Sequence, residues 1–108
     1  MKLAIIVLNK TECLDDILLK FHDEGIKGAT ILDSVGMAHQ LEADDELKFW
    51  GSLRSFLDPT HKESKTILVM TEDEKVQTIS DILNEVTGGL SNPDTGIMCT
   101  LNIEGIIK

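Results

Sequence analysis

The feature that most constrains this chain is a pattern that occurs twice along it. An apolar, strand-like run leads into an amphipathic helical run, which leads back into a second apolar run. Two βαβ units in 108 residues predict a single α+β domain over residues 1–108. We expect the ferredoxin-like βαββαβ plait, with a four-stranded antiparallel sheet and two helices on one face. The first unit covers residues 2–8, 11–24 and 28–35, and the second covers residues 65–70, 71–86 and 96–103.

The ends of the helices are predicted from residues that favour caps. Thr11 is expected to cap the first helix, and Gly25 is expected to follow it in the left-handed conformation. Thr71 and Glu74 have the spacing of a capping box at the start of the second helix. Gly88 is expected to end that helix.

The predicted strands are apolar on both faces. The helices cover one face of the sheet, and a large apolar face left in solvent is unusual for a monomer. We therefore expect subunits to pack sheet to sheet in a closed cyclic assembly. The alternative is that part of the central connection folds back over this face. Alternation along the first strand places Leu3, Ile5 and Val7 on one face and Ala4, Ile6 and Leu8 on the other.

The central connection, residues 36–64, is too long for a hairpin turn. Within residues 43–57 apolar side chains recur at spacings of three and four, which predicts a short extra helix. Trp50, Leu53 and Arg54 are candidate partner-binding residues there, because aromatic and Arg side chains concentrate binding energy. In the other interpretation, Trp50, Leu53 and Leu57 pack against the chain's own trimer.

The charge balance and the lengths of the apolar runs exclude several classes of protein. Asp and Glu number 19 against 10 Lys and Arg, for a formal net charge of −9. A field of this sign repels phosphate backbones, so we expect no nucleic-acid partner. The apolar runs are far shorter than the roughly 20 residues of a membrane span. No secretory leader is recognisable either, so we expect a cytoplasmic protein without membrane insertion.

The sequence contains no complete catalytic or metal-binding set, and we expect no enzymatic activity. The three histidines lack the spacing that is typical of a zinc site. Cys13 is expected to be a buried or idle thiol, because its acidic neighbours oppose a thiolate. Cys99 lies in the middle of the last predicted strand and is expected in the core.

Several stretches of the sequence resemble the PII nitrogen-regulatory family. They are residues 1–7, the Gly-Ile-Lys-Gly-Ala-Thr run at 25–30, Thr-Gly at 87–88 and Asn-Ile-Glu-Gly-Ile at 102–106. The resemblance implies a homotrimeric signal-transduction protein that senses a small-molecule effector. It implies ATP, ADP or AMP as candidate ligands in clefts between subunits. It also implies a central loop that docks onto a protein target, such as a transporter, an enzyme or a regulator.

The resemblance also assigns candidate ligand-binding residues. Gly36, Met37 and Gln40 align with the start of the family's central loop, where Gln40 is retained and the family's arginine is replaced by His39. The family's phosphate-binding lysines are missing from the loop after the second helix, residues 87–96. The candidate residues in that loop are Thr87, Gly88, Gly89, Asn92 and Gly96.

Two alternatives stay open. Loop 87–96 is either an anion-binding nest of backbone N–H groups or a connector whose glycines end the helix. The divalent-cation tolerance proteins are built on the same trimeric plait. A small metal-handling protein or enzyme is therefore the alternative function.

Overall fold

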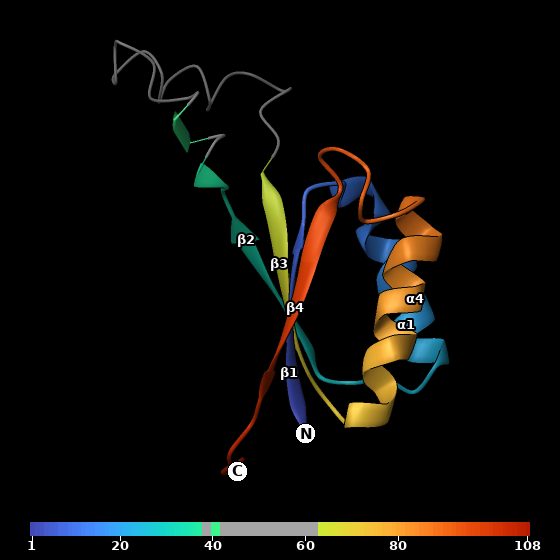
Figure 1. Ribbon diagram of the computed structural model, residues 1–108, viewed down its shortest axis with the longest axis vertical. Helices are drawn as coiled ribbons and strands as arrows, with labels where there is room; N and C mark the ends of the chain where they lie inside the picture. The colour runs from blue at the N-terminus through green and yellow to red at the C-terminus, as the bar shows by residue number, and fades with distance from the viewer. Residues whose placement is uncertain (38–39, 42–62) are drawn as a thin grey trace.

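Two helices cover one face of a four-stranded antiparallel sheet (Figure 1). The computed structural model describes residues 1–37, 40–41 and 63–108. The strand order β2-β3-β1-β4 confirms the predicted α+β, ferredoxin-like plait. The elements are β1 (Lys2–Leu8), a 3-10 turn (Thr11–Cys13), α1 (Leu14–Asp23), β2 (Ala29–Ser34), β3 (Ser64–Thr71), a second 3-10 turn (Asp73–Lys75), α4 (Val76–Thr87) and β4 (Gly96–Asn102).

The core lies between the helices and one face of the sheet. Alternate residues of β1 point into it, and these side chains are completely buried. Apolar residues at helical spacing on α1 and α4 pack against them from the other side. The fully buried residues of the core are Ala4, Ile6, Leu8, Ile17, Ile67, Val69, Ile79 and Leu83.

Neither predicted N-terminal cap is formed, and both predictions were wrong. Thr11 lies inside a 3-10 turn that precedes α1, and Thr71 is the last residue of β3, paired with Lys2. Each 3-10 turn closes with its own backbone hydrogen bond, from Cys13 N to Lys10 O at 3.0 Å and from Lys75 N to Glu72 O at 3.0 Å. These bonds use N–H groups that a side-chain cap would otherwise satisfy.

The predicted C-terminal ends of the helices are confirmed. Gly25 follows α1 with φ at +74°, and Gly88 follows α4 with φ at +86°. Both values are in the left-handed region, which glycine adopts without the steric cost of a Cβ. The N–H of Gly88 donates to Asn84 O at 3.1 Å and closes the last turn of α4.

Part of the central connection lies outside the described residues. The predicted helix at 43–57 and its candidate contacts Trp50, Leu53 and Arg54 fall there. Before it, Met37, Gln40 and Leu41 are helical. Within the ranges that are described, no helix is long and apolar enough to cross a membrane.

Candidate functional site

The two groups of predicted ligand-binding residues lie at the same end of the sheet but at opposite edges. Gly36 follows edge strand β2, whereas loop 87–96 leads into the other edge strand, β4. Three strand spacings separate these edges, or about 14 Å. One chain therefore does not bring the two groups together (Figure 1).

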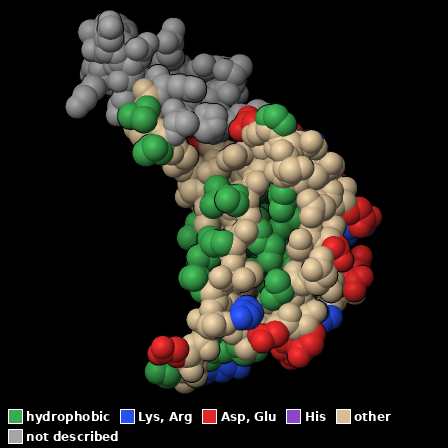
Figure 2. All heavy atoms as spheres, viewed as in Figure 1, with side chains coloured by type: hydrophobic (Ala, Val, Ile, Leu, Met, Phe, Trp, Pro, Cys, Tyr) green, Lys and Arg blue, Asp and Glu red, His purple; other side chains and the backbone are tan. Residues whose placement is uncertain are grey.

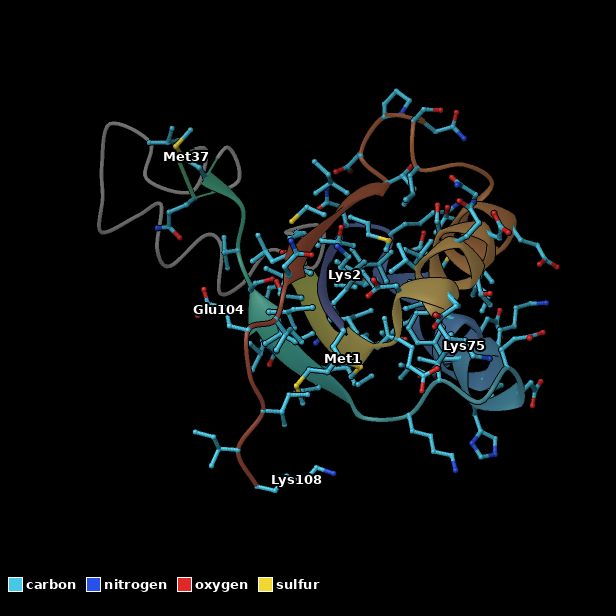
Figure 3. All side chains as sticks on the ribbon, turned by 60° about the horizontal axis from the view of Figure 1, so that its bottom comes forward. Met1, Lys2, Met37, Lys75, Glu104 and Lys108 are labelled. Atoms are coloured by element: carbon cyan, nitrogen blue, oxygen red, sulfur yellow. The ribbon has the colours of Figure 1, made fainter. Side chains whose placement is uncertain are left out.

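The segment after β2 turns outward from the sheet. Gln40 N donates to Gly36 O at 2.9 Å, which forms a single helical turn. The Met37 side chain is 79% exposed and lies on the opposite side of the view from the helices (Figure 3). Gly36, Met37 and Gln40 thus form an open surface rather than the wall of a pocket within the described chain.

Hydrogen bonds anchor both ends of loop 87–96 to the rest of the chain. Thr87 is only 2% exposed, and its hydroxyl donates to Leu83 O at 2.6 Å. At the other end of the loop, Thr95 O accepts hydrogen bonds from the N–H groups of Asn9 at 2.9 Å and Lys10 at 3.1 Å. The turn after β1 and loop 87–96 are therefore one connected unit.

The backbone N–H groups of the predicted anion nest are largely used inside the loop. Gly88 N donates to Asn84 O, and Gly89 N donates to Thr87 Oγ1 at 3.2 Å. Leu90 N donates to Asn84 Oδ1 at 2.9 Å, and Asn92 N donates to Gly89 O at 3.1 Å. These four amides already have protein acceptors, so they are not available to hold a phosphate. The arrangement favours the connector interpretation for this half of the loop.

A cation that the sequence did not single out lies beside this loop. Lys10, from the turn after β1, donates from Nζ to Thr87 O at 3.0 Å. A pocket of about 320 Å³ opens there, between the turn and the loop. Lys10 and Glu12 line it from the turn, and Thr87, Asn92, Asp94 and Thr95 line it from the loop.

The face of the sheet opposite the helices is apolar and open. Register places its residues in three rows across the strands, and no residue in these rows is charged. Ile97 is 66% exposed and Leu101 54% exposed, because no described element covers them. Figure 2 shows hydrophobic side chains over the sheet, whereas most of the acidic side chains lie over the helices. The rows are Leu32, Thr66, Val7 and Ile97; Thr30, Leu68, Ile5 and Cys99; and Met70, Leu3 and Leu101.

Cys99 belongs to this face, so the prediction that it lies in the core was wrong. It pairs with Ile5, whose side chain points away from the helices, and it is exposed. Cys13 is buried on the helical side, with Sγ 3.7 Å from Val86 O. An apolar pattern on both faces of a strand does not reveal which face the helices cover.

A second, smaller hollow lies at the other end of the molecule, which Figure 3 brings forward. It has a volume of about 240 Å³ and is lined in part by Met1, Ile26 and Lys75. Two of the cationic groups that line it have partners: the amino group of Met1 pairs with Asp73 at 3.1 Å, and Lys75 Nζ donates to Glu24 O at 2.8 Å. The hydrogen bond from this amino group lowers the pKa of the Asp73 carboxyl below its usual value of 3.8.

Metal-ligating side chains do not gather in the described part of the chain. Within residues 1–37, 40–41 and 63–108, no three His, Cys, Asp or Glu residues are placed to share an ion. Neither the protein-family models nor the curated proteins compared with this chain match it.

Proposed function

We propose that this chain is a PII-like regulatory protein that forms a homotrimer, senses a small metabolite between its subunits and signals to a protein partner. The observation that carries this proposal is the uncharged apolar face opposite the helices. Assembly through that face would remove apolar area from water, at roughly 25 cal/mol for each Å². The subunit number and the sensing role come from the resemblance to the PII family.

A cyclic assembly would also complete the candidate site. In a ring with these faces turned toward the axis, each contact is heterologous, so the β2 edge of one sheet meets the β4 edge of the next. Gly36 and Gln40 of one subunit would then approach loop 87–96 of its neighbour, because both lie at the same end of the sheet. The two groups of predicted residues would share one cleft.

The signal would pass through the central connection. A ligand that binds one arrangement of that connection more tightly than another shifts the population toward it. Trp50, Leu53 and Arg54 are the residues that we propose as contacts to the partner. An adenine nucleotide is one candidate ligand, although the loop lacks the lysines that would hold its phosphates.

Native mass spectrometry of the full chain, purified without added ligand, tests this function. We expect a particle of three times the 11.9 kDa chain mass and a small molecule that leaves on activation. A stable monomer at micromolar concentration would contradict the assembly. A retained transition metal, or turnover of a substrate, would instead support the alternative function resembling the divalent-cation tolerance proteins.

A further inference from the structure

The pocket between the turn after β1 and loop 87–96 is built from one chain and is held in shape before any ligand arrives. Three hydrogen bonds join its two walls: two from backbone N–H groups to Thr95 O, and one from Lys10 Nζ to Thr87 O. Thr87 and Thr95 are both buried. A ligand therefore meets groups that are already positioned, which lowers the entropic cost of binding.

The charges in this pocket do not suit a polyphosphate. Lys10 is its single cation, and Glu12 and Asp94 add two carboxylates. The whole chain also has a formal net charge of −9, so a ligand with several negative charges is repelled. The loop amides from Gly88 to Leu90 cannot compensate, because they donate within the protein.

The same charges suit a ligand that has one positive and one negative group. An ammonium has three N–H donors, and Lys10 uses one of them on Thr87 O. The remaining donors can hold a carboxylate. Glu12 lines the same wall of the pocket as Lys10, and its carboxylate can accept hydrogen bonds from a ligand ammonium.

The size of the pocket also favours a small ligand. Its volume of about 320 Å³ is near the lower end of the roughly 300–1,000 Å³ that is usual for ligand pockets. That space fits a molecule the size of an amino acid better than a nucleotide. Asn92 and Thr95 add polar groups to the lining, which includes no aromatic surface on which a base could stack.

We propose that this pocket binds a free amino acid as a zwitterion, with its carboxylate at Lys10 and its ammonium at Glu12. The inference rests on the proposed function, since it names the ligand class of the same candidate site. Asp94 is a second carboxylate among the residues that line the pocket. In the proposed assembly, Gly36 and Gln40 of the neighbouring subunit lie across the cleft from loop 87–96. Binding of an amino acid at this loop would therefore be sensed by that subunit.

The test is a titration of the full chain with each standard amino acid, followed by calorimetry and by the amide NMR shifts of loop 87–96. We expect at least one amino acid to shift the amides of Asp94 and Thr95. Its N-acetyl derivative, which has no ammonium, and its amide, which has no carboxylate, should not shift them. ATP and Mg²⁺ serve as the competing probes.

Three variants locate the binding. Lys10→Gln and Glu12→Gln should each raise the Kd about tenfold or more, because each removes a charge-assisted hydrogen bond. Lys20→Gln is the matched control, since Lys20 pairs with Glu85 at 3.1 Å on the helices and should leave the Kd unchanged. Glu12 takes no part in the hydrogen bonds that join the two walls, so Glu12→Gln tests ligand binding without removing a bond that shapes the pocket.

The outcomes separate this inference from the proposed function. If ATP or Mg²⁺ shifts these amides and no amino acid does, the ligand class is wrong while sensing at this loop stands. If an amino acid binds in the pocket of a chain that stays monomeric, the inference stands and the trimer fails. If N-acetyl or amide derivatives bind as tightly as the free amino acid, or if no probe shifts the loop, the inference is overturned.

Discussion

Ile5 of β1 lies directly opposite Cys99 of β4, on the face of the sheet that has no helix. The pair is in the middle one of the three rows that make up the open face. The face contains no charged residue, and Ile97, Leu101 and Met70 on it are exposed. Its residues therefore have the largest effect on whether subunits associate.

A charge placed on this face should dissociate the assembly. Leu101→Lys leaves a single chain almost unaffected, since Leu101 is already 54% exposed and the lysine stem can lie along the sheet. Packed against another subunit, an unpaired ammonium costs about 3–5 kcal/mol. Sedimentation velocity should give the 11.9 kDa monomer for this variant.

The neighbouring residue provides the control for that experiment. Thr100 is exposed and pairs with Ala4, so its side chain points to the helical side of β4. Thr100→Lys adds the same charge to the same strand and should leave the assembly intact. Equal sedimentation of the two lysine variants would show that the open face is not the contact.

The two cysteines should report the same association by their reactivity. Cys13 is buried within each chain, whereas Cys99 is exposed in a single chain and lies within the proposed contact. Iodoacetamide should modify neither thiol quickly in the wild-type assembly, and only Cys99 in Leu101→Lys. Peptide mass mapping after a timed reaction measures this. Rapid modification of Cys99 in the wild-type protein would argue against a covered face.

Gly96 should not tolerate a side chain, because it lies at the start of β4 where two backbones approach closely. A Cβ at this position would be 2.8 Å from Val7 O, a backbone atom that cannot move cheaply. We expect Gly96→Ala to lower the free energy of unfolding by about 1–3 kcal/mol, measured by urea denaturation. Gly105→Ala is the control, since nothing lies within 4 Å of its Cβ. Matching midpoints for both variants would contradict this explanation.

The buried hydroxyl of Thr87 should stabilise loop 87–96. It donates to Leu83 O at 2.6 Å and accepts from Gly89 N at 3.2 Å. Thr87→Val keeps the shape but leaves two polar groups without this partner, at a cost of about 1–3 kcal/mol. Amide hydrogen exchange at Gly89 should become faster in Thr87→Val and stay slow in Thr87→Ser. An unchanged exchange rate in Thr87→Val would mean that the hydroxyl does not hold the loop.

Much of the fold could be predicted because its signals are local. Short runs of consecutive apolar residues predicted the strands, helical spacing predicted the helices, and Gly25 and Gly88 marked the helix ends. The starts of the helices could not be predicted in this way. Thr71 forms a backbone pair with Lys2, a partner 69 positions earlier in the chain, and a capping pattern contains no information about that pairing.

The candidate site shows the same limit. The sequence identified loop 87–96 from its glycines and from the PII resemblance, but not the acceptors that its amides use. It also did not single out Lys10, which is 77 positions from Thr87 and reaches the loop only because β1 and β4 are paired. A lysine ten residues from the start of the chain has no local feature that marks it as part of a pocket.

The ion pair between Asp33 and Lys65 should make stability depend on pH at the alkaline end. The two residues are opposite each other in the β2–β3 pair. The hydrogen bond to Asp33 raises the pKa of Lys65 above its usual value of 10.5. A raised pKa means that the folded state holds the proton more tightly, so the stabilisation is complete below pH 10.5 and is lost as the pH rises through the folded-state pKa.

Asp33→Asn is the variant that tests this pH dependence. The wild-type chain should be more stable than Asp33→Asn at neutral pH, and the difference should shrink in alkaline solution above the usual lysine pKa of 10.5. Added salt should reduce the difference at neutral pH, because both side chains are in contact with solvent. Urea denaturation of both proteins across this range measures it. A difference that stays constant through the alkaline range would mean that Lys65 does not titrate against Asp33, and that the pair adds no pH-dependent stability.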